Sequence, residues 1–341
     1  MKAKFKLITL LAILTTSLVS CNNGNNSTTG NVSSGDSNFI SNVISNEPSV
    51  TPSIPSVISS TTIPSTPSTS VPSPGISVTP SSTSSDTSSS VIEGKWQYFL
   101  QSDSSASKEF MRTPYIEGIV SSVSDSYYQS AIGKTGSSLT NALKQIVNVS
   151  GLTRSYDWSR YEKVDEDPNN ANNVFCIYSR SSYPKTAHVS GNAANKWNRE
   201  HSYPQSKISK NAAKDSNLIY ADDWKTNNAR GNYQFSEVVH NSSTAVKDSA
   251  NKVTANYRSG SYFEPCDAAK GEVARATLYV YVMYGHSIEG NFSSLDLCLK
   301  WNREYPVTSW EMLRNNRNYD IQKNRNPFID HPEFADLMFN K

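Results

Sequence analysis

The chain has 341 residues, with 32 Lys and Arg against 30 Asp and Glu, and a formal net charge of +2. This length allows about two domains, and the composition, with only four cysteines, excludes a small disulfide scaffold and a fully disordered chain. The charges are unevenly spread, because no Lys or Arg occurs between Lys6 and Lys95. Residues 95–341 contain 29 basic and 26 acidic side chains, carry a charge of +3, and are long enough for one large globular domain.

Residues 1–21 have the pattern of a bacterial lipoprotein signal peptide. Three lysines precede an apolar run over residues 7–19, which is too short to span a bilayer comfortably as a helix. The run leads into Leu18-Val19-Ser20-Cys21, which resembles a lipobox, so we expect cleavage there and lipidation of Cys21. The alternative is an ordinary cleavage site and a freely secreted protein.

Residues 22–94 consist mainly of Asn, Ser, Thr, Pro and Val, with almost no aromatic side chains. Such a segment buries too little apolar surface to offset the entropy of ordering, so we predict a disordered tether. As a flexible coil, its about 73 residues span roughly 45–50 Å, enough to hold a domain away from a surface. An adhesive or glycosylated stalk with a role of its own is the alternative.

Apolar periodicity returns after the tether. Leu139, Leu143, Ile146 and Val147 recur at helical spacing, which predicts a core-facing helix with Ser137 or Ser138 as its cap. The helix should therefore form part of the core of the C-terminal domain.

Other segments support a domain with more helices than strands. Residues 268–284 favour a buried helix, although their β-branched and aromatic tail also admits a strand. We predict short helices at residues 305–313 and 332–339, and a short strand at residues 174–178. Helices with few short strands and no repeats indicate an α+β domain. Residues 95–126 are either packed on this domain or the last part of the tether.

Three cysteines follow the tether, Cys176, Cys266 and Cys298, with no C-x-x-C pair and no zinc-like spacing. An odd count argues against a disulfide framework. At most one bridge can form, and buried free thiols fit equally well.

Residues 196–237 concentrate the groups that phosphodiester hydrolysis needs. A neutral imidazole at His201 can take a proton from water near neutral pH. The Glu200 carboxylate and the Asn227 amide carbonyl are hard oxygen ligands that suit Mg²⁺ or Ca²⁺ better than zinc. Arg230, three residues after Asn227, would lie on the same helical face and offers donors for a phosphate. Base, hard cation and arginine together indicate cleavage of a phosphodiester.

The order of these residues resembles the bacterial endonuclease I family of extracellular and periplasmic non-specific nucleases. Residues 198–206 are similar to its N-R-E-H-x-x-P-x-S signature, and residues 227–238 to its N-x-x-R-S-N-Y-P-F-G-E-V segment. Residues 127–143 and 323–333 also resemble family segments, so the resemblance covers about residues 127–339.

The resemblance implies a ββα-metal (His-Me) finger embedded in a mostly helical domain, with the histidine on a strand and the metal-binding asparagine on the following helix. Matched position by position, His201 would be the general base and Glu200 and Asn227 the ligands of one Mg²⁺-like ion. Arg230 would contact the phosphate. Ca²⁺ and Mn²⁺ stay open as alternatives to Mg²⁺. Family members cleave DNA or RNA with little sequence preference and leave a 5′-phosphate.

The chain departs from the family pattern at two positions. Asn217 stands where the family usually has a histidine, in D-L-H-H-L or D-L-H-N-L, and Gln234 follows Tyr233 in place of the usual proline. If that histidine supports the base or the phosphate in relatives, Asn217 would do so more weakly. The second change should affect only a turn.

Two further expectations concern the surroundings of the base. Asp215, Asn217 and Asn232 are expected to support the site or to touch the substrate. Neighbours on a regular strand point to opposite faces, so Glu200 and His201 can share one site only if the strand ends or twists there.

A domain charge of +3 predicts weak, salt-sensitive binding of nucleic acid. Two clusters of basic residues are candidates for one groove, with a solvated charged face as an equal alternative. They are Lys207, Lys210, Lys214, Arg314, Arg317, Lys323 and Arg325.

The sequence therefore predicts a surface-anchored, metal-dependent endonuclease acting on DNA, with RNA as a second candidate. It would sit on the extracellular face of a bacterial membrane, or be secreted if Cys21 is not lipidated, and no protein partner is implied. The competing hypothesis is a catalytically weak or inactive lipoprotein that binds nucleic acid, in line with Asn217. A solute-binding lipoprotein would need two α/β lobes, which the helix-rich pattern does not favour.

Overall fold

The computed structural model describes residues 89–100 and 105–341. The predicted signal peptide with Cys21 lies outside the described residues, as does the predicted tether up to residue 88. In the two described stretches, no helix combines the length and the apolar character needed to cross a bilayer. Lipid anchoring therefore stays a prediction.

The described chain begins with a small antiparallel sheet whose strands pair in the order β1-β2-β3. Its strands are β1 Ser90–Glu93, β2 Trp96–Phe99 and β3 Arg112–Pro114. Phe99, Phe110 and Met111 are buried in the hydrophobic core. The described residues between 95 and 126 are thus packed on the domain, and strand structure begins at Ser90, before the predicted boundary.

The rest of the described chain combines helices with three further small sheets, as expected for an α+β domain. The helices are α1 Gly136–Val147, α2 Trp158–Val164, α3 Trp224–Arg230, α4 Asp267–Tyr284, α5 Leu295–Glu304, α6 Ser309–Gln322, α7 Pro327–Asp330 and α8 Phe334–Phe339. The strands are β4 Asn173–Phe175, β5 Ser182–Pro184, β6 Trp197–His201, β7 Ile219–Asp223, β8 Gln234–Phe235, β9 Ala245–Lys247, β10 Val253–Ser259 and β11 Tyr262–Glu264. Short 3₁₀ helices are η1 Lys108–Met111, η2 Asp125–Tyr128, η3 Lys185–Ala187, η4 Gln205–Lys207, η5 Ala212–Lys214 and η6 Ile288–Gly290.

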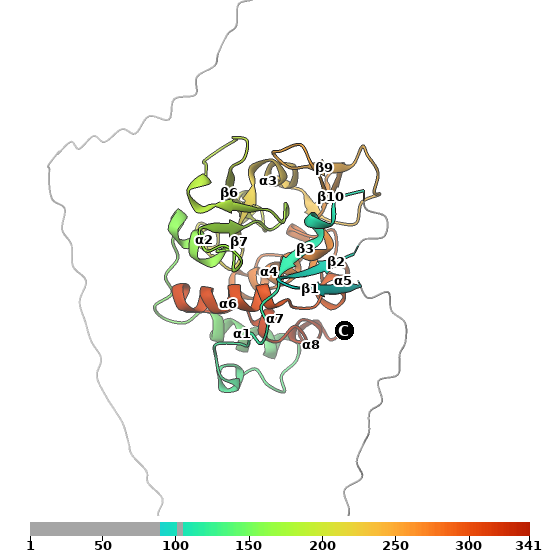
Figure 1. The fold of residues 1–341 in the computed structure, drawn as a ribbon. Helices are drawn as coiled ribbons and strands as arrows, with labels where there is room; N and C mark the ends of the chain where they lie inside the picture. The colour runs from blue at the N-terminus through green and yellow to red at the C-terminus, as the bar shows by residue number, and fades with distance from the viewer. Residues whose placement is uncertain (1–88, 101–104) are drawn as a thin grey trace, which may run out of the picture. The chain divides into compact units, whose positions relative to one another are not determined.

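Two of these sheets are the pairs β4-β5 and β6-β7, and the third has the order β8-β11-β10-β9. In the four-stranded sheet β9, β10 and β11 are antiparallel, and β8 adds to β11 in parallel. Figure 1 shows β6, β7 and α3 at one end of the domain and α1 and α8 at the other.

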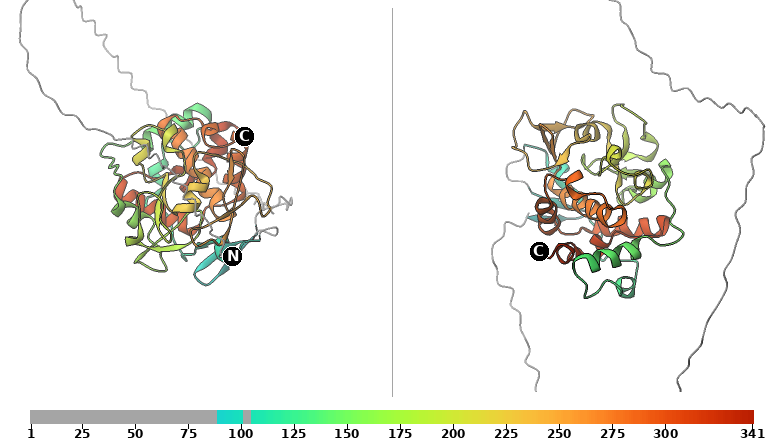
Figure 2. Two further views of the ribbon diagram at one scale, coloured as in Figure 1. Left: turned by 90° about the horizontal axis from the view of Figure 1, so that it is seen from above. Right: turned by 180° about the vertical axis from the view of Figure 1, so that it is seen from behind.

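Helix α4 lies at the centre of the fold. Sixteen of its 18 residues are buried, so the helix is enclosed on every side and the prediction of a buried helix is confirmed. Figures 1 and 2 show it running through the middle of the domain, and it packs against α1, α5 and α7. Its buried charges are paired, as burial requires: Glu272 with Arg180 at 3.0 Å and Arg275 with Glu311 at 2.6 Å.

The helix predicted from Leu139, Leu143, Ile146 and Val147 is also confirmed as α1, in which Ile146 is half-buried and the other three side chains are buried. The predicted cap is wrong, because Thr135 holds the N-cap position without a side-chain cap bond. The Ser138 hydroxyl instead donates to the Thr135 carbonyl at 2.7 Å.

The predicted boundaries of two C-terminal helices and of one strand were less accurate. Helix α6 begins at Ser309, because Thr308 and Glu311 form a capping box there, and it extends to Gln322. Helix α8 begins at Phe334, two residues after the predicted start. Strand β4 ends at Phe175, short of the predicted residue 178.

All three cysteines of the described chain, Cys176, Cys266 and Cys298, are free and buried. The hypothesis of buried free thiols is confirmed, and that of a bridge is excluded for this structure. Burial raises the pKa of each thiol, so none is a ready nucleophile at neutral pH.

Removing one partner of the buried pair between Arg275 and Glu311 should be strongly destabilising. We expect Glu311→Gln to lower the free energy of unfolding by about 3 kcal/mol, because the buried Arg275 charge loses its partner. The matched control is Glu237→Gln, which removes one side of the exposed pair with Lys300 and should cost less than about 1 kcal/mol. Urea unfolding followed by circular dichroism measures both. Equal losses for the two variants would contradict the account.

Candidate functional site

The candidate site is built on a two-stranded ribbon followed directly by a helix. Strands β6 and β7 are antiparallel, with His201 opposite Ile219 and Trp197 opposite Asp223. The loop of residues 202–218 joins them, and α3 starts at the residue after β7 ends. Helix α3 packs against both strands, as Figure 1 shows.

Local sequence fixes both ends of α3. At its start, the Asp223 carboxylate accepts hydrogen bonds from the backbone amides of Lys225 and Thr226, at 2.9 and 3.2 Å. This is the N-cap arrangement that Asp favours. At its end, Gly231 has φ +51°, and a Cβ there would lie 3.4 Å from the Asn228 carbonyl oxygen. Glycine lets the chain turn sharply at this point.

A pocket of about 270 Å³ opens where β6 ends beside α3. It is lined by Tyr156, Asn198, Arg199, Glu200, His201, Pro204, Gln205, Asn227, Gly231 and Asn232. The structure thus brings together four predicted site residues, Glu200, His201, Asn227 and Asn232. Four consecutive residues of β6, from Asn198 to His201, border the pocket, so Glu200 and His201 share it at the end of the strand.

His201 has the environment of a neutral base. Its side chain is 7% exposed, and Nε2 lies 3.1 Å from the Ala213 carbonyl oxygen. A carbonyl only accepts, so Nε2 carries the proton and Nδ1 keeps its lone pair. Burial, with the charges of Arg199 and Arg230, lowers the pKa of His201 to about 4. The imidazole is therefore neutral and able to accept a proton at pH 7.

Glu200 is a buried carboxylate beside this base. One of its oxygens, Oε1, accepts a hydrogen bond from the Tyr178 hydroxyl at 2.9 Å and lies 3.5 Å from Arg230 Nε. Burial raises the pKa of Glu200, although Arg230 and the tyrosine favour its charged form. A further cation near this carboxylate would stabilise its charged form.

Asn227 faces the pocket from α3 and is anchored to β6. Its Nδ2 donates to Asn198 Oδ1 at 2.7 Å, which leaves the carbonyl oxygen Oδ1 of Asn227 available for a cation. Asn198 is two residues before Glu200, so both lie on the strand face that α3 covers. The amide and the carboxylate therefore meet in one place.

These oxygens fit one hard cation. Among the described residues no group of three or more His, Cys, Asp or Glu side chains could hold a metal ion. A site in this pocket would combine the Glu200 carboxylate with the amide oxygen of Asn227. Mg²⁺ is commonly bound through one or two carboxylates and keeps several waters, which matches such a sparse set of protein oxygens.

Arg230 lies behind the pocket. Its side chain is fully buried, with Nη1 donating to the Gly231 carbonyl at 2.9 Å and Nη2 to the Ser202 carbonyl at 2.7 Å and to Asn291 Oδ1 at 2.6 Å. Its Nε faces Glu200. This geometry does not support the predicted phosphate contact, because Arg230 is fully buried and does not line the pocket. The arginine instead holds Glu200 and the neighbouring loops in place.

Arg199 is a pocket cation that the sequence reasoning missed. It lines the pocket, and its guanidinium lies 3.5 Å over the Tyr156 ring and 3.8 Å over the Trp158 ring. Its Nη1 donates to the Tyr156 carbonyl, whereas its Nε has no hydrogen-bond partner in the described part of the chain. The two-residue period of a strand could have found it, because Arg199 and His201 share one face of β6.

Asp215 and Asn217 do not line the pocket. Asp215 is fully buried and accepts hydrogen bonds from Tyr279, Tyr284 and Gln322 side chains, at 2.8, 2.6 and 2.7 Å. It fixes the loop of residues 202–218 to α4 and α6.

Asn217 belongs to the same buried cluster and donates to Asn324 Oδ1 at 3.2 Å. Its own Oδ1 lacks a partner within the described residues. The substitution of the usual family histidine therefore falls behind the site and leaves the hydrogen bond of His201 untouched.

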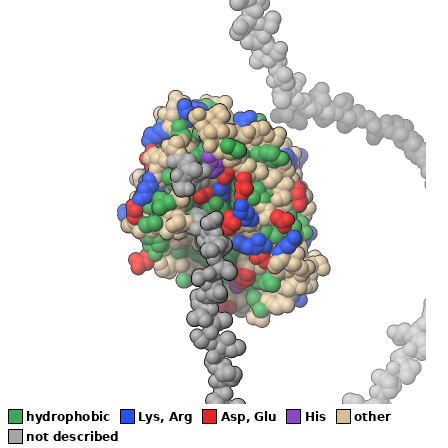
Figure 3. All heavy atoms as spheres, turned by 90° about the vertical axis from the view of Figure 1, so that its right-hand side faces the viewer, with side chains coloured by type: hydrophobic (Ala, Val, Ile, Leu, Met, Phe, Trp, Pro, Cys, Tyr) green, Lys and Arg blue, Asp and Glu red, His purple; other side chains and the backbone are tan. Residues whose placement is uncertain are grey.

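Two of the seven residues of the predicted basic groove lie in the core, and a groove formed by the other five stays a prediction. Arg314 is buried and paired with Asp165 at 2.6 Å, and Arg325 is buried and paired with Asp330 at 2.7 Å. These arginines join parts of the core and are unavailable to a ligand. On the face in Figure 3, basic and acidic side chains are interspersed, with no broad region of one sign.

The environment of His201 makes a prediction about its titration. We expect its imidazole to stay neutral from pH 8 down to about 5 and to take up a proton near pH 4, because burial disfavours the charged form. Histidine ring signals in NMR spectra measure this. As the control, the same histidine in the urea-unfolded chain should titrate near pH 6.5. A folded-state midpoint at that value would contradict the assigned environment.

Comparison with the sequences of known proteins identifies the family of this chain. The endonuclease I family profile matches residues 135–333, which include the whole pocket region of β6, β7 and α3. The chain is 35% identical over 236 residues to an extracellular ribonuclease of Bacillus amyloliquefaciens, covering 63% of this chain and 78% of that protein. It is 36% identical over 236 residues to the extracellular ribonuclease of Bacillus subtilis (strain 168), with the same shares covered.

A shorter match is to an extracellular deoxyribonuclease of Aeromonas hydrophila, 31% identical over 101 residues, which covers 30% of this chain and 42% of that protein. The family profile spans more than half of the chain, and the ribonuclease matches extend over most of those relatives. The chain therefore belongs to the endonuclease I family.

Proposed function

We propose that β6, β7 and α3 form a ββα-metal (His-Me) finger, and that the chain is a divalent-cation-dependent endonuclease without sequence preference. One observation carries this proposal. A buried, neutral His201 with a free Nδ1 borders the same pocket as a carboxylate and an amide oxygen from Glu200 and Asn227. These are the groups that hydrolysis of a phosphodiester requires.

In this proposal His201 is the general base. Nδ1 takes a proton from the attacking water, and the bond from Nε2 to the Ala213 carbonyl holds the ring and stabilises the imidazolium that forms. The negative charge of a bound phosphodiester offsets part of the nearby positive charge and so favours the imidazolium that forms.

Glu200 and Asn227 would hold the cation. When bound, a divalent ion neutralises the charge that develops on the phosphate and on the leaving oxygen. Mg²⁺ fits the oxygen ligands best, with Mn²⁺ and Ca²⁺ as alternatives. Loss of the leaving group at its 3′ oxygen gives products with a 5′-phosphate.

Two arginines would then have separate roles. Arg199, at the pocket wall, contacts a phosphate oxygen of the substrate, which its planar guanidinium suits. Arg230 acts as a positioning residue, because it is buried and holds Glu200. Asn232 is exposed at the rim and is placed to touch the substrate backbone.

The names of the relatives bear on substrate and location. The longer matches are to extracellular ribonucleases, and shorter ones to extracellular and periplasmic deoxyribonucleases. We therefore propose that both RNA and DNA are substrates and that the chain acts outside the cytoplasm. Anchoring through a lipid on Cys21 remains part of the proposal.

The competing hypothesis of an inactive binding protein rested on Asn217. That side chain lies in the buried cluster with Asn324 and does not border the pocket, so its substitution removes no group that the proposed mechanism uses. Family membership and the intact pocket favour an active enzyme.

Cleavage assays with the full chain test the proposal. We expect plasmid DNA and RNA to be cut with Mg²⁺ and left intact with EDTA. His201→Ala should lower the rate about 10²–10⁴-fold, because it removes the base. Asn227→Ala should lower it strongly as well, whereas the neighbouring Asn228→Ala, on the exposed face of α3, is the control and should keep activity. DNA that is bound but not cut with Mg²⁺, Mn²⁺ or Ca²⁺ would sink the enzyme hypothesis.

The division between the arginines is tested by lysine substitutions. Arg199→Lys should lower kcat/KM roughly tenfold with little change in stability, because a point charge replaces a planar fork. Arg230→Lys should lower the free energy of unfolding by about 3 kcal/mol, because buried hydrogen bonds are lost. Steady-state kinetics and urea unfolding measure the two effects. Full activity of Arg199→Lys, or an unchanged stability of Arg230→Lys, would contradict the assignment.

A further inference from the structure

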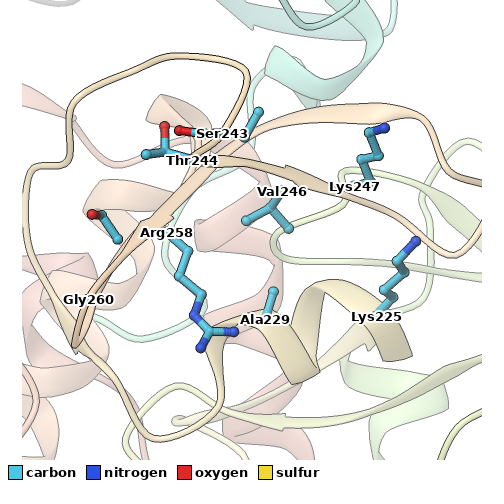
Figure 4. Close-up of a pocket in the computed structure, with 10 residues that line it drawn as sticks. Lys225, Ala229, Ser243, Thr244, Val246, Lys247, Arg258 and Gly260 are labelled. Carbon is cyan, nitrogen blue, oxygen red and sulfur yellow. The ribbon is translucent and has the colours of Figure 1, made fainter.

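A second pocket lies on the other side of α3. It has a volume of about 390 Å³ and is lined by parts of α3, β9 and β10 and by the turns beside the two strands. Figure 4 shows Lys225 and Lys247 at one end of this pocket and the Arg258 guanidinium beside Ala229 at the other. Nothing in the proposed chemistry uses these residues.

The lining of this pocket is basic. It contains Lys225, Lys247 and Arg258 and no acidic residue. Lys225 Nζ donates to Asn251 Oδ1 at 2.6 Å, and Arg258 donates to the Tyr233 hydroxyl, both neutral partners.

Some exposed lysines elsewhere are paired with carboxylates, as Lys300 is with Glu237 and Lys108 with Glu93, each at 2.6 Å. For the three cations of the second pocket, the described part of the chain offers no such ion pair. Their positive charge is therefore not neutralised and attracts an anion.

The position of this pocket relative to the candidate active site follows from the helix. Lys225 and Ala229 are four residues apart and face the second pocket, whereas Asn227 and Gly231, also four apart, face the first. Exposed Asn228 lies between the two faces. The pockets are thus on either side of one helix, which is about 10–12 Å wide with its side chains.

The two pockets are also connected around the end of α3. The Tyr233 ring is 3.8 Å from the Cβ position of Gly231, which borders the active-site pocket. The Arg258 guanidinium, which borders the second pocket, lies 4.2 Å over that same ring. A strand leaving the first pocket can therefore follow Tyr233 into the second.

Resting on the proposed nuclease function, we propose that the second pocket is a subsite for the sugar-phosphate backbone of the substrate. Phosphates are spaced about 3.4 Å along the axis of a duplex and farther apart in an extended single strand, so a helix width corresponds to at most about three or four phosphates from the bond that is cut. Lys225, Lys247 and Arg258 contact the backbone there. Such contacts carry no sequence information, which suits non-specific cleavage, and they favour long chains over short fragments.

Binding in EDTA tests the subsite without turnover. The probe is a fluorescein-labelled, single-stranded DNA of 20 nucleotides, and its anisotropy is followed with the full chain at several salt concentrations. For Lys225→Gln with Lys247→Gln we expect the slope of log K against log salt to fall by about 1.4, since each phosphate contact with a single strand contributes about 0.7. Arg258 is left intact, because it contacts Tyr233 at the active-site rim.

The control removes the same charge elsewhere. Lys134→Gln with Lys144→Gln changes two exposed lysines that border neither pocket, and its slope should match the wild type. Equal slopes for the two double variants overturn the subsite, as does a wild type that does not bind the probe. Urea midpoints of both variants, equal to that of the wild type, show that the fold is intact.

Cleavage separates this inference from the nuclease proposal. With Mg²⁺, KM of the Lys225→Gln, Lys247→Gln variant for the 20-nucleotide strand should rise roughly fivefold to tenfold at unchanged kcat, whereas cutting of a trinucleotide should not change. A wild type that binds with the expected salt slope but does not cut contradicts the nuclease proposal alone. Equal KM increases on both substrates contradict the subsite.

Discussion

A buried charge holds the site together. The Arg230 guanidinium is fully enclosed and donates to the Ser202 carbonyl and to Asn291, beside the Glu200 carboxylate. A buried charge is tolerated only when it is paired and hydrogen-bonded, so α3 has to stay close to β6 and to the loops at its end. That restraint turns Asn227 toward the pocket and fixes the carboxylate at its wall. The geometry of the proposed metal site therefore depends on a residue that does not touch the pocket.

The same enclosure sets the electrostatics of the proposed reaction. Burial and two arginines keep His201 neutral, and burial also raises the pKa of Glu200, so this carboxylate gains from a nearby cation. An anionic substrate and a divalent cation would thus each improve the site for the other. Basic side chains elsewhere, such as Arg314 and Arg325, are used in buried ion pairs. A chain of low net charge would therefore need a local cluster of free basic side chains to hold a nucleic-acid backbone.

The sequence predicted long, strongly patterned elements well, and α1 and α4 follow directly from the spacing and length of their apolar runs. Short strands such as β8, with two residues, carry too little pattern to be seen. Motif order predicted Glu200, His201 and Asn227 as site residues, and all three line one pocket. Sequence spacing misplaced Arg230, because helical spacing fixes a face but does not say whether that face is buried. Arg199 was not predicted, because the motif singled out the neighbouring Glu-His pair. A strand places alternate residues on one face, so the position of His201 could have indicated Arg199.

The central claim is that Glu200 and Asn227 hold one divalent cation beside His201. The direct test is anomalous diffraction from crystals of the His201→Ala chain grown with Mn²⁺ and an uncut oligonucleotide. The account predicts a single manganese peak within about 2.0–2.5 Å of both the Glu200 carboxylate and Asn227 Oδ1, with a substrate phosphate oxygen completing its contacts. A peak bound to other residues, or a phosphate seated in the pocket with no metal beside it, would contradict the account.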